Sequence, residues 1–301
     1  MPAVHVTLDA VIVAVTDDRP KVLTVSAPAG SVPRLPTGVL REDDRTLEAA
    51  LRRFVVDETG LDVGYVEQLY TFGDSERQPG GERLLSIAYL ALVREAAPSA
   101  DAAWVDWYDL YPWEDHRSGR PPVIPELIAP TLDAWVGEAR SAPERSRREE
   151  RAHVVFGLGG VAWDGVRVLE RFELLYETGL LEESTARRSE AVRSLALQGD
   201  HRRIVATALG RLRGKLTYRP VVFELLGETF TLSQLQELVE ALSGARLHKP
   251  NFRRLVEGAG LVEATGTTAP TGGRPAALYR FRRDVVRERP RPGVGTPWTR
   301  G

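Results

Sequence analysis

The sequence of 301 residues contains no cysteine, which excludes disulfide bonds, thiolate metal sites and a cysteine nucleophile. Its five histidines form no HxxxH-type cluster, so a structural zinc site is not expected. No apolar run approaches the roughly 18 residues that a transmembrane helix needs, and the N-terminus lacks the basic region and cleavage site of a signal peptide. We therefore expect a cytoplasmic protein with no membrane segment, no bound metal and no required cofactor.

Acidic and basic residues are distributed unevenly along the chain, although the formal net charge is only −2. Residues 1–140 contain 13 Lys and Arg against 23 Asp and Glu, whereas residues 201–284 contain 14 against 7 and residues 285–301 contain 4 against 1. A basic back half either binds a polyanion or docks on the acidic front half. Charge alone leaves both interpretations open.

The first part of the chain, residues 1–140, shows an α/β pattern. Two alternating β-branched runs, residues 4–15 and 21–26, flank a turn-like segment and predict a hairpin. Apolar spacing predicts a helix over residues 45–59 that ends at Gly60, and strands over residues 64–72 and 84–93. We expect an aromatic loop at residues 104–113 and a helix at residues 125–140.

The rest of the chain reads as largely helical. Residues 141–199 are expected to be a helical linker or dimerisation segment, with a charged start at residues 141–151 and helices over residues 163–178 and 183–197. Residues 200–285 show three helical patterns followed by two β-like segments around a glycine-containing loop, the order of a winged helix-turn-helix. Residues 286–301 are expected to be a flexible tail.

The third of these helices, at about residues 250–259, has the composition of a DNA-recognition helix. Phe252, Leu255 and Val256 have the spacing of a buried stripe, which leaves the polar residues near the N-terminus on other faces. Arg can bind guanine bidentately and Asn can bind adenine. A basic helix in a protein-binding winged helix is the other interpretation. The candidate DNA-binding residues, including phosphate contacts and the hairpin tip, are Lys215, Arg219, His248, Lys249, Asn251, Arg253, Arg254, Thr271, Gly273 and Arg274.

The stretch GVLREDDRTLEAALRRFVVDETGL resembles the Nudix box, in which helix carboxylates hold divalent cations against a diphosphate. Two departures stand out, because Phe54 occupies the place of the first helix Glu and Arg45 that of the upstream Glu. The resemblance implies a Nudix-like fold without an intact cation site. The positions that match the box are Arg53, Val55, Asp57, Glu58, Gly60 and Leu61.

The whole layout resembles the Nudix-related transcriptional regulators of the NrtR type. The segments LHKPNFRRLVEGAGLVEATG and TGGRPAALYRFR are similar to their winged helix, and the middle segment is similar to a longer alphaproteobacterial branch linked to de novo NAD synthesis. The resemblance implies a homodimeric repressor of NAD-biosynthesis genes that binds double-stranded operator DNA and senses an adenine nucleotide, either ATP or ADP-ribose. An active Nudix hydrolase of a nucleoside-diphosphate derivative is the alternative.

Residues for such a nucleotide follow from the chemistry of its parts. Guanidinium groups match phosphate oxygens, and an aromatic ring can stack on adenine. Arg53 can also be a structural partner for Asp57 or Glu58 along the helix. The candidate ligand-binding residues are Arg34, Arg53, Asp57, Glu58, Phe72, Arg77 and Arg83.

Overall fold

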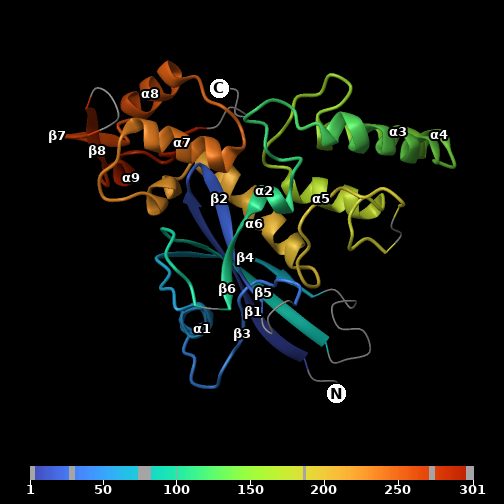
Figure 1. Cartoon of the computed structure of the whole chain (residues 1–301), viewed down its shortest axis with the longest axis horizontal. Helices are drawn as coiled ribbons and strands as arrows, with labels where there is room; N and C mark the ends of the chain where they lie inside the picture. Colours follow the sequence, from blue (N-terminus) through green and yellow to red (C-terminus); the bar gives the residue numbers. More distant parts are fainter. Residues whose placement is uncertain are drawn as a thin grey trace.

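The computed structural model describes residues 4–26, 31–73, 83–99, 101–185, 188–270 and 275–295 (Figure 1). Its main sheet has the strand order β4-β5-β1-β2-β6, with β3 paired to β1. The strands are β1 (Val4–Thr16), β2 (Arg19–Val25), β3 (Thr37–Val39), β4 (Tyr65–Phe72), β5 (Arg83–Leu92) and β6 (Ala102–Asp106). The predicted β1–β2 hairpin and the strands β4 and β5 are confirmed, and β1 runs parallel to β5.

The two faces of the sheet are covered by helices from distant parts of the chain. In β1, Leu8, Ala10 and Ile12 pack in one apolar cluster with α1 (Leu47–Thr59), whereas Val11 and Val13 belong to the cluster that includes α6 (His201–Leu216). Successive side chains of a strand point to opposite faces, so one alternating run serves both cores. The helix predicted before Gly60 is confirmed as α1, which is capped by Thr46 and ends at Gly60 with φ 71°.

Between the sheet and the winged helix the structure agrees with the predicted helices at residues 125–151 and differs from the predictions on either side of them. Residues 104–113 contain the end of β6 and the short helix α2 (Trp107–Leu110) instead of a loop. The π-helical turn η2 (Ile124–Ile128) continues into α3 (Ala129–Gly137). The charged segment at residues 141–151 is helix α4 (Ala142–Phe156), and α5 (Val168–Glu177) is shorter than expected.

The helix predicted at residues 183–197 is wrong, because the described part of this segment is irregular. Its backbone N–H groups bond to other segments instead of to the preceding turn: Val192 donates to Leu180 O and Leu195 donates to Asp109 O, both at 2.8 Å. Val192 and Leu197 are buried. Tertiary contacts therefore override the helical spacing of the sequence.

The winged helix is confirmed. It contains α6, the 3₁₀ turn η3 (Val221–Leu225), α7 (Leu232–Ser243), α8 (Lys249–Gly258) and the antiparallel hairpin of β7 (Val262–Ala269) and β8 (Ala276–Phe281). A reciprocal capping box of Thr231 and Gln234 begins α7, and Gly244 in the left-handed conformation ends it. Phe230 pairs with Tyr279, which ties the segment before α7 to the hairpin.

Residues 286–295 are not the free tail that the sequence predicts. A short helix, α9 (Val285–Glu288), follows the hairpin, and Val285 is buried. Val294 is also buried and donates its backbone N–H to Leu216 O at 2.9 Å. The end of the described chain therefore packs against the C-terminus of α6.

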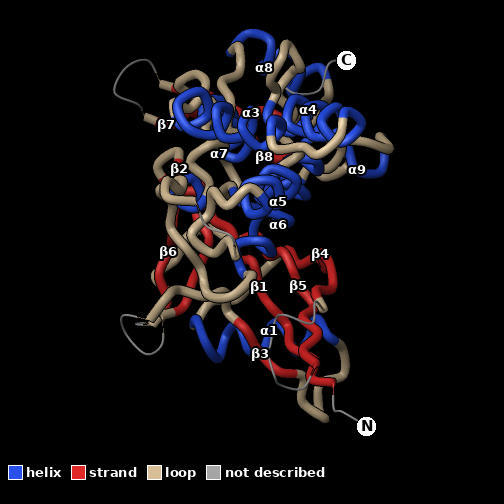
Figure 2. The backbone as a smooth tube through the Cα atoms, turned by 90° about the vertical axis from the view of Figure 1, so that its right-hand side faces the viewer, coloured by secondary structure: helices blue, strands red, loops and turns tan. Residues whose placement is uncertain are grey.

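Figures 1 and 2 show the main sheet with α1 at one end of the molecule and the other helices towards the opposite end, with α6 at the centre of both views. Helix α6 contacts β1, β4 and β5 as well as α5, α7 and η3. It was predicted as the first helix of the winged helix, but it also covers one face of the sheet. None of the helices in the described ranges is long and apolar enough to cross a membrane.

Candidate nucleic-acid interface and effector site

Helix α8 presents a polar face to solvent, as the sequence predicts. Phe252 and Val256 are buried, whereas Asn251, Arg253 and Arg254 are exposed. The prediction that Leu255 belongs to the buried stripe is wrong, because its side chain is 44% exposed. At 100° per residue, Leu255 lies 60° from Phe252 and 100° from Val256, on the edge of the stripe.

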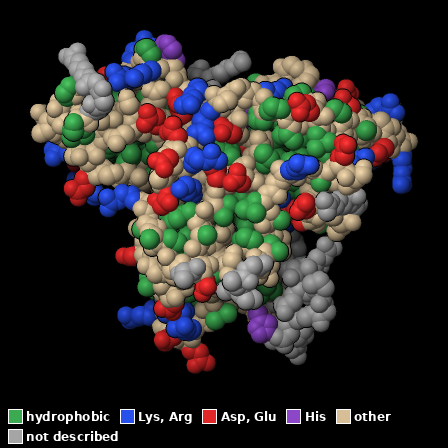
Figure 3. Space-filling model, in the orientation of Figure 1, with side chains coloured by type: hydrophobic (Ala, Val, Ile, Leu, Met, Phe, Trp, Pro, Cys, Tyr) green, Lys and Arg blue, Asp and Glu red, His purple; other side chains and the backbone are tan. Residues whose placement is uncertain are grey.

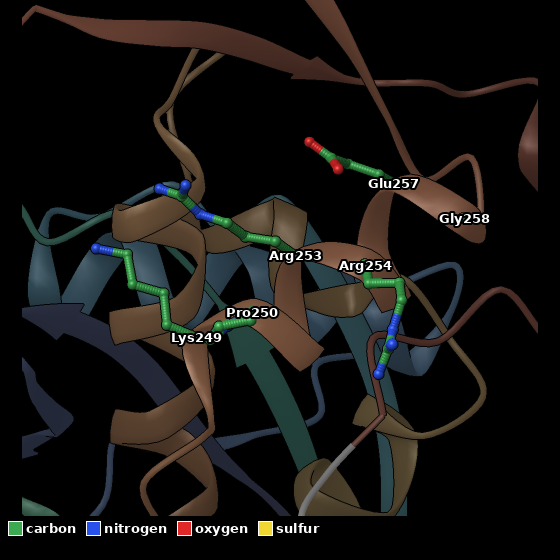
Figure 4. Close-up of a pocket in the computed structure, with 6 residues that line it drawn as sticks. All are labelled: Lys249, Pro250, Arg253, Arg254, Glu257 and Gly258. Atoms are coloured by element: carbon green, nitrogen blue, oxygen red, sulfur yellow. The ribbon is translucent and has the colours of Figure 1, made fainter.

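The basic residues of α8 surround an open depression of about 610 Å³ (Figure 4). Lys249 and Arg253 extend to the same side of the helix, and Arg254 points to another. Within the described residues neither Lys249 nor Arg253 forms an ion pair, and Arg254 donates to Asn251 Oδ1 at 2.9 Å. Unpaired cations beside an exposed helix N-terminus form a surface that suits phosphate oxygens and base edges. The lining residues are Lys249, Pro250, Arg253, Arg254, Glu257 and Gly258.

The other predicted DNA-binding residues have different surroundings. His248 is exposed at the N-cap of α8, and Arg219 is exposed with no ion pair in the described structure. Lys215 does not fit its prediction as a phosphate contact, because its ammonium group pairs with Glu67 and donates to the Tyr65 hydroxyl at 3.0 Å. It holds α6 to β4 instead. Thr271, Gly273 and Arg274 at the hairpin tip lie outside the described residues.

The carboxylates of the Nudix-box helix face different partners. Glu58 accepts hydrogen bonds from the Arg34 guanidinium and, at 3.0 Å, from the Thr37 backbone N–H. Asp57 is exposed, and its nearest cations are Arg41 at 3.7 Å and Arg53 at 3.8 Å. Arg34 and Glu58 are therefore together, as expected for one site, while Asp57 points elsewhere.

Arg53 has a partner that the sequence analysis did not name. Its guanidinium donates to both carboxylate oxygens of Asp44, at 3.0 and 2.7 Å. This hydrogen-bonded pair lowers the pKa of Asp44 to about 2. Arg53 thus fixes the loop before α1, and its contact with Asp57 is secondary.

Phe54 fills the space between α1 and β3. It is buried, and a Cβ atom on Gly38 would lie 2.3 Å from its ring, so the ring and the Gly38 backbone are in direct contact. In the described part of the chain, no three His, Asp or Glu side chains form a group that could hold a metal ion. These residues do not fit the divalent cations of an active Nudix site, since Asp57 and Glu58 diverge and the third position is an apolar ring.

Of the remaining ligand candidates, Phe72 does not fit its prediction as a ligand contact. Its ring is buried and lies 5.9 Å from the Arg203 guanidinium of α6, so it belongs to the contact between sheet and helix and is not open to an adenine. Arg77 and the side chain of Arg83 lie outside the described residues.

Among the buried charged residues that the sequence did not reveal, three form one cluster. Glu114 accepts hydrogen bonds from Arg171 of α5 at 2.5 and 3.1 Å and from Arg213 of α6 at 2.5 Å, and all three side chains are 0% exposed. Burial would raise the pKa of the Glu114 carboxyl, but Arg171 and Arg213 outweigh it and hold the pKa below its usual value. Arg213 also donates to Leu242 O of α7 at 3.0 Å. We call these three residues the buried triad.

The loop that carries Arg34 is attached to the start of α6. The Leu35 backbone N–H donates to His201 Nδ1 at 2.9 Å, and the Gln198 N–H donates to Pro33 O at 2.8 Å. Leu35 itself is buried. One end of α6 therefore contacts the Arg34–Glu58 pair through a single peptide segment, and the other end enters the buried triad and the winged helix.

Comparison with known proteins places both parts of the chain. Residues 6–127 match the NUDIX domain model, and residues 222–281 match the model of the NrtR DNA-binding winged helix domain. The "ADPR responsive transcriptional repressor NtrR" of Acinetobacter baylyi is 24% identical over 284 residues, which cover 93% of this chain and 83% of that protein.

Two solved structures share the fold over nearly the whole chain. Shewanella oneidensis NrtR, in complex with a 27mer DNA, has a TM-score of 0.58 at 24% identity, covering 94% of this chain and 95% of that one. A MutT/nudix family protein from Enterococcus faecalis has a TM-score of 0.54 at 17% identity, covering 94% and 88%. The chain therefore contains a region that matches the Nudix domain, followed by a region that matches the NrtR-type winged helix, and it shares the fold of NrtR.

Proposed function

We propose that this protein is a DNA-binding transcriptional repressor whose Nudix domain binds ADP-ribose as an effector. The observation that carries the proposal is the face of α8, where Lys249, Arg253 and Arg254 project from a winged helix without a carboxylate in salt-bridge contact. Two-fold operators are usual for such modules, so we propose a homodimer. Genes of NAD biosynthesis are the proposed targets.

The choice of ADP-ribose over ATP rests on the relative from Acinetobacter baylyi, which is named as responsive to ADPR. In this chain, the Arg34–Glu58 pair is only partly exposed and lies beside the backbone of Thr37. A diphosphate that competes with Glu58 for the Arg34 guanidinium would gain a charge-assisted pair there. ATP offers the same chemistry and is the second nucleotide to test.

Helix α6 gives the effector a physical route to the DNA-binding face. The segment from Arg34 to Thr37 is hydrogen-bonded to Glu58 on one side and to His201 on the other. A ligand that shifts this segment acts on the first turn of α6, and α6 is continuous with the winged helix at Arg213 and Leu216. Coupling needs different affinities of the ligand for two arrangements of the chain.

A catalytic role is not part of the proposal. Of the relatives named above, NrtR was solved in complex with DNA and NtrR is named a transcriptional repressor. Phe54 occupies a cation-ligand position, and Glu58 is held by Arg34 and Thr37. Hydrolysis of a nucleoside diphosphate remains the alternative function, and a Mg²⁺-dependent assay of ADP-ribose cleavage separates the two.

The proposed function is tested by selecting duplexes that the full-length protein retains from a random library. Fluorescence anisotropy with the selected duplex then measures affinity with and without ADP-ribose, ATP or NAD. We expect ADP-ribose to change the affinity by about 5- to 150-fold, the usual range of allosteric coupling. Failure to bind any duplex would reject the DNA-binding role, and an affinity that no nucleotide changes would reject the sensor role.

A further inference from the structure

The described chain ends in a segment that lies beside α8. Residues 287–295, called here the C-terminal arm, are fixed at two points. The Arg289 guanidinium donates to Gly258 O at the end of α8, at 3.2 Å, and the Val294 N–H donates to Leu216 O at the end of α6. The arm therefore has a defined position on the winged helix.

Two glycines show how closely the arm packs. A Cβ atom on Gly293 would lie 2.1 to 2.3 Å from backbone atoms of Thr217 and Tyr218, an approach that only glycine permits. A Cβ atom on Gly295 would lie 3.3 Å from Leu255 Cδ1. The arm thus runs beside α8 from Gly258 to Leu255, on the flank next to Asn251.

The charges of the arm are largely unneutralised. Its single acid, Glu288, is bound by both terminal nitrogens of Arg282, at 2.8 and 2.6 Å. Arg287 and Arg291 are exposed and form no ion pair in the described ranges. The segment that carries these two unpaired arginines lies beside α8, whose Arg253 and Arg254 form no ion pair in the described ranges, and cations without counter-ions favour a polyanion.

We propose that the C-terminal arm is a further DNA-contacting element, in which Arg287 and Arg291 bind backbone phosphates beside the groove that α8 enters. The proposal rests on the proposed function and adds a contact outside the helix-turn-helix and its wing. Contacts to phosphates carry no base information, so the arm raises affinity for every sequence and fixes the position of α8 on the duplex.

The test compares the double variant Arg287→Ala/Arg291→Ala with the matched control Arg145→Ala/Arg147→Ala. The control residues lie on α4, are exposed and form no ion pair in the described chain, so the net charge changes equally. Affinity for the selected duplex and for a scrambled duplex is measured by anisotropy at several salt concentrations. Circular dichroism checks that each variant is folded.

Log K falls as log salt rises, and each lost phosphate contact makes this slope shallower by about 0.9. We therefore expect the slope of the arm variant to be shallower by about 1.8 per chain on both duplexes. The α4 control should keep the wild-type slope. An arm variant with the wild-type slope, in an experiment where Arg254→Ala does weaken binding, overturns the arm contact and leaves the proposed function intact. Wild-type protein that binds neither duplex overturns both.

A second variant, Gly293→Val, keeps every charge but cannot fit against Thr217 and Tyr218. We expect it to make the slope of log K against log salt shallower, as in the arginine variant. A folded Gly293→Val protein with the wild-type slope would show that the fixed position of the arm does not contribute.

Discussion

At the scale of single residues, two sets of arginines have opposite environments. Arg171 and Arg213 are completely buried and bind Glu114 and backbone carbonyls, so they serve the architecture. Arg253 of α8 is exposed and unpaired in the described structure, as is Arg219. The sequence identifies Arg253 as a candidate contact, but it does not show that Arg171 and Arg213 are buried, because their partner Glu114 lies far away along the chain.

The exposed group gives a first prediction. Arg253→Ala and Arg254→Ala should each lower the affinity for the selected duplex by about 1–3 kcal/mol per chain, because a base or phosphate contact is lost. Glu257→Gln on the same helix is the control, since it removes an exposed acid and should leave binding equal or tighter. Anisotropy titrations measure the change. Wild-type affinity in both arginine variants would rule out a DNA contact through these residues of α8.

The second residue-scale prediction concerns catalysis. We expect neither the wild-type protein nor Phe54→Glu to cleave ADP-ribose with Mg²⁺, because Glu58 stays bound to Arg34 and Thr37 and Asp57 points away from it. Phe54→Glu should also lower the melting temperature, since it places a carboxylate in an apolar contact with Gly38. Turnover of about 1 per second or more, within the ordinary range of enzymes, would contradict the prediction.

At the scale of elements, helices whose ends are fixed by residues close in the chain were predicted correctly. Segments whose conformation depends on contacts with distant residues were not. Thr231, Gln234 and Gly244 fix the ends of α7 through local hydrogen bonds, so this helix is visible in the sequence. The segment around Val192 has a helical pattern but bonds to Leu180 and Asp109. The same limit applies to the site: Arg253 follows from its helix, whereas the Arg34–Glu58 and Arg53–Asp44 pairs join separate elements.

Helix α6 lies between the segment from Arg34 to Thr37 and the winged helix, which leads to a prediction for His201. His201→Ala removes the acceptor for the Leu35 N–H and should leave ADP-ribose and DNA binding separately measurable while reducing the coupling between them. His201→Asn places an amide oxygen near the position of Nδ1 and should restore it. The coupling is read from DNA titrations with and without ADP-ribose. Full coupling in His201→Ala would show that this hydrogen bond does not transmit the signal.

At the scale of the whole molecule, the buried triad joins all three parts of the chain. Glu114 follows α2 of the Nudix part, Arg171 lies on α5 and Arg213 lies on α6, beside the C-terminus of α7. The Tyr108 hydroxyl and the His116 N–H add hydrogen bonds to Ala241 O and Gly244 O, at 2.7 and 2.8 Å. Figure 3 shows Lys and Arg side chains interspersed with Asp and Glu side chains across the middle of the face in view. We expect the parts to unfold together.

Removing the central carboxylate should therefore affect the entire protein. Glu114→Ala leaves two arginines buried without their partner, which typically costs about 3–5 kcal/mol. The pKa of Glu114 is lowered in the folded state, so the carboxylate stabilises the fold above its unfolded pKa, and this stability is lost as the pH falls through the folded value. Urea unfolding from neutral to acidic pH should show a single transition whose acid sensitivity is reduced in the variant. Two separate transitions at neutral pH would disprove the joint unfolding.

The placement of α6 has a consequence for recombining this protein with its relatives. Ile204 and Leu212 lie in the same apolar cluster as Val11 and Val13 of the sheet and as Leu238 and Val239 of α7. If the chain were divided at residue 200, α6 would stay with the winged helix. The face of the sheet that α6 covers would then be exposed to solvent, and so would the side of α6 that packs on the sheet. A chimaera that exchanges effector specificity must carry residues 1–219 as a block and repair the Arg213–Leu242 and Val294–Leu216 contacts at the new junction. The Nudix part and the winged helix therefore cannot be exchanged independently, because both include α6.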